Sequence, residues 1–259
     1  MEPIVFGATE LVRFALVLVR VGGIVVFAPF FSSPSIPPQV KAVVALTSTV
    51  ALLPALPADR IPAQFGLGDV ALSIAGQALV GLTLGLAASF VFAGLQLAGQ
   101  IIGFQLGFSI VNVIDPQSQV ETSVVSVLEN FVGLLLFLIC NGHHWFFRAV
   151  AESFTYLPVG GVRLEAAVVE QLVRLSSHIL VAGLQIAGPV LAVTVIADVI
   201  LGVIGRAAPQ INILIVGMPL KTLVGFACLS FAFYFVPQFL GIQFLELSKA
   251  LSGLVRALG

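Results

Sequence analysis

Charge is scarce in this sequence. Charged residues make up 9% of its 259 residues, where a soluble globular domain has roughly 25%. The formal net charge is −1, so neither a basic nor an acidic surface is available to attract a polyelectrolyte. This balance gives no support for nucleic-acid binding. No polar linker interrupts the chain either, which favours a single domain over residues 1–259.

The residues that carry most enzyme chemistry are also missing. No nucleophile elbow, phosphate-binding loop or dinucleotide fingerprint occurs. Cys140 and Cys228 lie in apolar stretches, so no disulfide framework is predicted. Cys140, His143 and His144 stand close together, but without a second ligand pair they do not match a structural zinc site. We therefore predict no enzyme activity, no metal and no cofactor.

What the chain has in abundance is apolar surface. Apolar residues make up 59% of the sequence, and its mean hydropathy is +1.15. The run from Val70 to Ile114 contains no charged residue. At about 1.5 Å per helical residue, such a run is long enough for two passes through a hydrocarbon core of about 30 Å. The sequence therefore predicts a membrane-embedded protein.

Proline and polar clusters divide the chain into apolar segments, which predicts an all-α integral membrane protein. Six or seven long apolar helices are expected, arranged in hairpins. An amphipathic helix over 161–178, with a Glu170–Arg174 pair on its polar side, precedes the last two segments. The segments cover roughly 11–31, 42–57, 70–90, 91–113, 130–147, 176–200 and 222–245.

Several polar groups lie inside these segments. Arg13 and Arg20 share one side of the first helix, and either face protein or water or mark the membrane interface. Glu129 and Asp198 are carboxylates in apolar surroundings. Asp198 is either a proton or ion site of a secondary transporter or the structural partner of Arg206 or Lys221.

Glycine recurs with a helical period in the uncharged run. Gly81 and Gly85 form one GxxxG pattern, and Gly99, Gly103 and Gly107 form two more in register. Small residues at this spacing let two helix backbones approach closely. The same glycines would also serve as hinges, but close packing is favoured.

The composition changes after Gly107, where β-branched residues, an asparagine and an Asp-Pro step argue against a continued helix. Irregular backbone at membrane depth is tolerated only where it is buried in protein or lines a pathway. The loop near 106–122 is therefore either a re-entrant plug or an ordinary helix end.

Three separated motifs in the chain belong together. They are GQIIGFQLGFSIVNVIDPQSQ from Gly99 to Gln119, NGHHWFFRAVAESFTYLPVG from Asn141 to Gly160, and the stretch from Arg206 to Lys221. Together they resemble the FliR family of flagellar type III export-gate proteins, which has relatives in injectisomes. They occur in the order that the family has, and the resemblance covers nearly the whole chain.

The resemblance implies a structural and gating subunit of the bacterial inner membrane, located in the flagellar basal body. Expected partners are FliP-type, FliQ-type and FlhB-type subunits, rod proteins, unfolded protein substrates and membrane lipid, with no nucleic acid. One such chain would complete a helical ring that nucleates the rod. Residues of about 1–165 would form a FliP-like part, and those of about 166–259 a FliQ-like part.

The resemblance also suggests roles for individual residues. The loop would project into the pore as part of the closed gate, and a turn would join the last two helices. The plug side chains would be Phe108, Ile110, Val111, Val113 and Ile114, with Asp115 and Pro116 fixing the return of the loop. The turn would contain Arg206, Pro209, Gln210, Asn212 and Pro219.

Overall fold

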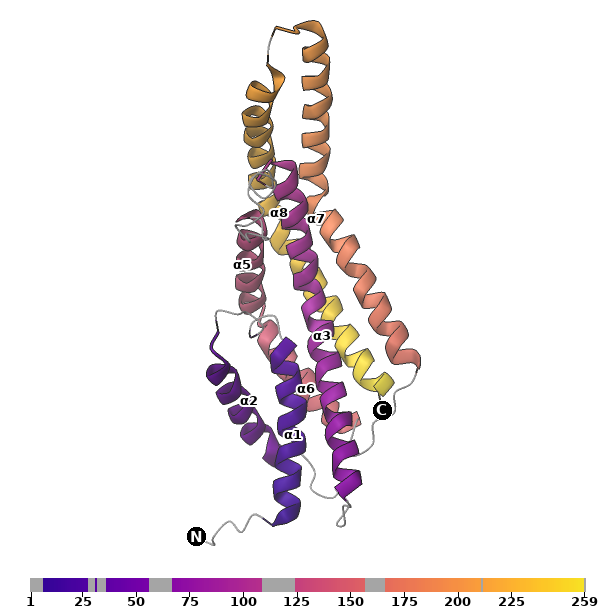
Figure 1. Cartoon of the computed structure of the whole chain (residues 1–259). Coiled ribbons are helices and arrows are strands. Elements are labelled where there is room, and N and C mark those ends of the chain that lie inside the picture. The colour runs from indigo at the N-terminus through magenta and orange to yellow at the C-terminus, as the bar shows by residue number, and fades with distance from the viewer. Residues whose placement is uncertain are drawn as a thin grey trace. The chain divides into compact units, whose positions relative to one another are not determined.

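Helices account for the regular structure of the chain (Figure 1). The computed structural model describes residues 7–27, 31, 36–55, 67–108, 124–156, 166–210 and 212–258. Within these ranges there is no strand, which confirms the all-α prediction. The helices are α1 (Ala8–Phe27), α2 (Pro38–Leu52), the short 3-10 helix η1 (Leu53–Ala55), α3 (Leu67–Gln105), α5 (Val124–Ile139), α6 (Gly142–Tyr156), α7 (Ala166–Ala207) and α8 (Ile213–Leu258).

Three helices are long and apolar enough to cross a membrane. These stretches are Gly68–Gln105 in α3, Val168–Ala207 in α7 and Ile215–Leu254 in α8. Helices α2 and α5 are apolar but shorter. The helix lengths and composition therefore agree with a membrane-embedded protein.

The long helices differ from the predicted segments in their boundaries. Segments 70–90 and 91–113 were expected as separate passes, but α3 runs unbroken through both as far as Gln105. Neither proline nor charge interrupts this stretch, so nothing in it stops a helix. Segment 130–147, in contrast, was expected as one helix but forms two, α5 and α6. The break lies at Asn141, which has a positive φ of 56°.

Helices α7 and α8 extend beyond the predicted segments at both ends. The predicted amphipathic helix forms the first turns of α7, and its Arg174 donates to Glu170 at 3.0 Å as expected. Pro189 lies within α7, while Pro219 and Pro237 lie within α8. Proline removes one backbone donor, which membrane helices tolerate when neighbouring groups satisfy the freed carbonyl.

The chain divides into two compact units. The first contains Met1–Phe90, Asn141–Ser176 and Leu245–Gly259; the second contains Val91–Cys140 and Ser177–Phe244. Helices α3, α7 and α8 contribute residues to both units.

Arg20 is the polar centre of the first unit. Its side chain is fully buried. Its Nε donates to Gln77 Oε1 of α3 at 2.5 Å, and its Nη1 donates to Ser153 Oγ of α6 at 3.1 Å. The guanidinium also lies 4.0 Å from the centroid of the Phe154 ring. One side chain of α1 thus bonds to two other helices, and it faces protein.

Arg13 is buried on the same side of α1. Its Nη2 donates to the carbonyl oxygen of Leu53 in η1 at 3.0 Å, and its Nη1 lies 3.5 Å from Glu10 Oε2. Of the two alternatives for this pair of arginines, the one in which they face protein agrees with the structure.

Glycines bring α1 and α3 into backbone contact. A Cβ atom added at Gly81 would overlap the carbonyl oxygen of Arg20, and one at Gly85 would lie 2.9 Å from the carbonyl oxygen of Ile24. On the α1 side, a Cβ at Gly23 would lie 3.1 Å from the backbone nitrogen of Leu82. The surface where these helices meet therefore has no room for a side chain at Gly81.

We expect Gly81→Ala to destabilise the protein and Gly22→Ala to leave it intact. Alanine within a helix is favoured over glycine by about 0.5–1 kcal/mol, and a Cβ at Gly22 would meet nothing within 4 Å. At Gly81 the overlap with backbone would force α1 away, and overpacking typically costs about 1–3 kcal/mol. Melting temperatures of the detergent-purified variants test this. Equal stability of the two variants would contradict the close approach.

Candidate functional site

The second unit contains the start of the predicted plug loop. Helix α3 ends at Gln105, and Gly107 follows with a φ of 86°. The Gly107 amide donates to the carbonyl of Phe104 at 3.1 Å, and the Phe108 amide donates to that of Gly103 at 3.0 Å. These two bonds, with glycine in the left-handed region, form a Schellman motif. Gly107 therefore terminates α3, so that the chain leaves the helix at a defined point.

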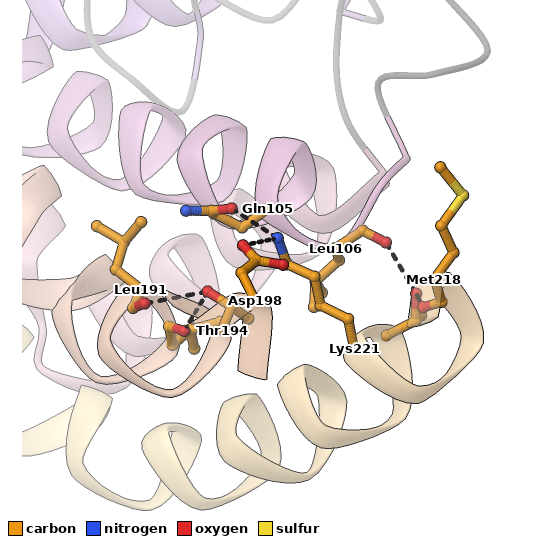
Figure 2. Close-up of polar contacts among 9 residues, drawn as sticks. Gln105, Leu106, Leu191, Thr194, Asp198, Met218 and Lys221 are labelled. Atoms are coloured by element: carbon orange, nitrogen blue, oxygen red, sulfur yellow. Dashed lines mark hydrogen bonds and ion pairs between the residues drawn. The ribbon is translucent and has the colours of Figure 1, made fainter. Parts of the chain in front are cut away.

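Lys221 of α8 lies beside this helix end, as Figure 2 shows. Its Nζ lies 2.6 Å from Asp198 Oδ2 of α7 and donates to Gln105 Oε1 of α3 at 3.2 Å. The side chain of Lys221 is 18% exposed and that of Asp198 is 50% exposed. One ammonium group thus bonds to two other helices at the point where the loop begins.

The next residue of α8 adds a bond to the backbone. Thr222 Oγ1 lies 3.0 Å from the carbonyl oxygen of Leu106 and 2.9 Å from that of Met218, and its single hydroxyl hydrogen is shared between them. The last carbonyls of a helix lack intrahelical partners, so this bond satisfies one of them. We refer to Gln105, Asp198, Lys221 and Thr222 as the Lys221 cluster.

Apolar contacts continue along the same side of α8. The buried side chain of Leu106 packs directly on Gly225, where a Cβ would have no space. One residue further along α8, the Phe226 ring stands edge-on to the Phe108 ring, with centroids 5.7 Å apart. Phe108 is the first of the proposed plug residues and the only one in the described part of the chain. Ile110, Val111, Val113, Ile114, Asp115 and Pro116 lie outside the described residues.

Comparison with known proteins gives the family. Residues 11–247 match the family described as bacterial export proteins, family 1. The chain is 33% identical to the flagellar biosynthetic protein FliR of Escherichia coli K12 over 93% of its own length and 92% of that protein. It is 31% identical to FliR of Pectobacterium carotovorum, over 93% and 91%, and 31% identical to FliR of Bacillus subtilis 168, over 86% and 88%. The chain belongs to the FliR family.

Membership of the FliR family gives this chain a role in flagellar export. As an export component it works with other parts of the export apparatus, and its apolar helices embed it in a membrane.

Asp198 is paired in the structure. Of the two alternatives raised by the sequence, a cation partner agrees with the 2.6 Å contact to Lys221. Arg206, the other candidate cation, lies in the last turn of α7 and is exposed. An ion pair with Lys221 compensates the carboxylate charge, and together with FliR membership it gives the transporter interpretation no support.

The turn between the last two helices is short. Of its described residues, Pro209 and Gln210 form the turn and Asn212 precedes α8. Pro219 was predicted in this turn but lies inside α8. The carbonyl of Asn212 accepts the Ile215 amide at 3.1 Å, which starts the first turn of that helix.

Gly99 and Gly103 lie in the part of α3 that belongs to the second unit, and both are buried. Gly99 packs against the backbone of Ser126 in α5, whose hydroxyl donates to the carbonyl oxygen of Gln96 at 3.1 Å. Two turns further along α5, a Cβ at Gly133 would lie 2.8 Å from a methyl carbon of Leu95. This glycine-lined surface brings α5 close to α3.

Glu129 lies on the same buried face of α5. Its side chain is almost fully buried, and neither carboxyl oxygen has a hydrogen-bond partner among the described residues. Burial of a polar group without such a partner costs free energy. Glu129 is therefore a destabilising feature of the packing between these helices.

Because Glu129 is buried without a described partner, we expect Glu129→Met to raise the melting temperature of the purified protein. Methionine fills a similar volume without a polar group, and about 1 kcal/mol corresponds to about 2–4 °C in a chain of this size. Glu170→Met is the control, because Glu170 is exposed and its pair with Arg174 is worth little. A lower melting temperature for Glu129→Met would mean that the carboxyl group has a stabilising partner.

The sequence shows the polar residues of the Lys221 cluster, but it does not show which of them bond to one another. Gln105 and Lys221 are each visible as polar residues beside apolar stretches, but they lie 116 positions apart. Arg20 and Gln77, in the other unit, lie 57 positions apart. No local pattern links such residues. A sequence rule that would have found them is that each polar side chain inside an apolar helix needs a partner of its own.

We expect Asp198→Asn to support flagellar export within about twofold of the parent protein, because a half-exposed ion pair contributes about 0–1 kcal/mol. Asparagine also keeps an oxygen that accepts from Lys221. Swimming motility and the amount of secreted flagellar protein measure the effect. Loss of export with normal assembly would instead assign Asp198 a role in ion movement.

Proposed function

We propose that this chain is a structural and gating subunit of the flagellar type III protein export apparatus. It forms the export gate with FliP-type and FliQ-type subunits in the bacterial inner membrane, within the flagellar basal body. One copy completes a helical ring through which unfolded flagellar subunits pass, and the assembly nucleates the rod. An FlhB-type subunit and rod proteins are further partners.

The observation that carries the proposal is the way the loop begins. Helix α3 stops at Gly107 through a Schellman motif, and the next residue, Phe108, packs on Phe226 of α8. A loop that leaves a long apolar helix from a fixed point is suited to closing a pathway. Apolar side chains in such a loop would exclude ions by filling space and by dewetting.

The exposed surface of α7 supports a role in assembly. Large β-branched side chains follow one another along this helix, each at least half exposed. Such a surface requires lipid or another protein to cover it. The companion subunits of an export gate would pack against it. The residues are Val195, Ile196, Val199, Ile200 and Val203.

The proposed division of the chain follows its helices. Residues of about 1–165 form the FliP-like part, and α7 and α8 form the FliQ-like part. A chain that joins both parts would contact each type of companion subunit. This arrangement explains how one copy closes a ring built from two other proteins.

We expect deletion of Ser109–Val113 to make the membrane leak ions and small solutes while the complex still assembles. The deletion removes apolar side chains that fill the closed gate. Deletion of an equal length from the segment between α2 and α3, Asp59–Ala63, is the control and is expected to keep the membrane tight. Solute-dependent growth and conductance of the purified complex measure the leak. A tight membrane after deletion of Ser109–Val113 would remove the plug from the proposal.

Native mass spectrometry tests the assembly. We expect the chain, produced with its companion subunits, to form a large hetero-oligomer that holds one copy of it. A monomer or symmetric homodimer that ignores those subunits would contradict the proposal as a whole.

A further inference from the structure

Two successive turns of α8 hold three of the four residues from Gln105 to Phe108, at the start of the loop. Lys221 bonds to Gln105, Thr222 bonds to the carbonyl of Leu106, and Phe226 packs on Phe108. The contacts follow the same order along both segments. Gly225, between the last two α8 positions, leaves the space that the Leu106 side chain fills.

We propose that Lys221, Thr222 and Phe226 are positioning residues that latch the start of the loop to α8 and so set how tightly the gate closes. The proposal rests on the proposed function, because it assumes that the loop is the plug. It adds that the closed position depends on α8, through bonds that lie outside the loop itself.

Lys221 connects the end of α3 to α7 as well as to α8. Its ammonium divides its donors between the carboxylate of α7 and the amide of α3. Its side chain is mostly buried, so the ammonium is held between these helices. The latch therefore positions the start of the loop relative to two helices.

The bond from Thr222 to the backbone fixes which residue of α3 lies against this turn of α8. The hydroxyl reaches the carbonyl of Leu106, the residue just before the glycine that ends α3. A side chain that binds the backbone at the helix end fixes where the loop starts, whatever side chains the loop carries. Lys221 supplies charge and Thr222 supplies position.

The test uses the full complex with its companion subunits. The double variant Lys221→Met, Thr222→Val removes the charge-assisted bonds and the backbone bond while keeping similar volumes. We expect it to assemble normally and to raise the ion and solute leak several-fold, to a level below that of the Ser109–Val113 deletion. Lys221→Arg, which keeps a cation in the cluster, is expected to stay close to the parent protein.

Ser230→Ala is the matched control, because Ser230 lies on α8 and bonds only to the carbonyl of Phe226 within its own helix among the described contacts. It is expected to stay tight. Thr222→Val alone is a nearly isosteric change, and it keeps the test decisive if the double variant fails to assemble. We expect a smaller leak from this single variant.

The deletion of Ser109–Val113 distinguishes failure of the latch from failure of the plug. If it leaks while both the Thr222→Val and the double variant remain as tight as Ser230→Ala, the latch is wrong and the plug stands. If the deletion itself stays tight, the plug is wrong and the latch is overturned with it.

Discussion

Lipid solvates an apolar side chain about as well as a neighbouring helix does, so hydrophobic contact alone cannot choose which helices pair in this chain. The choice depends on places where two backbones approach closely enough to exclude any side chain. Gly81 provides one such place against α1, and Gly99 provides another against α5. The other contacts described within each unit become possible once these approaches are made.

A polar bond lies within about one turn of each close approach. Beside Gly81, Gln77 accepts from Arg20. Near Gly99, the carbonyl of Gln96 accepts from Ser126. Close packing excludes lipid and brings short polar side chains within reach of their partners, and the bonds then oppose sliding of one helix along the other. This combination occurs between α1 and α3 in the first unit and between α3 and α5 in the second.

The features that could be predicted from the sequence are those with local signals. The apolar composition predicted membrane helices, the Glu170–Arg174 spacing predicted an ion pair, and the composition change after Gly107 predicted the end of α3. Helix lengths were predicted less well, because no charge or proline interrupts the run through 90 and 91, while Pro189 and Pro219 do not stop their helices. The pairings in the Lys221 cluster join residues far apart in the chain, and only the fold brings them together.

The start of the loop repeats the combination that pairs the helices elsewhere. Gly225 lets Leu106 pack on α8, and Thr222, one turn before it, binds the Leu106 backbone. What differs is the addition of Lys221, whose ammonium bonds to α7 and to α3 at once. Close packing and the Thr222 bond fix the end of α3 against α8 alone. Lys221 adds α7 to this contact, so the point where the loop begins depends on three helices rather than two.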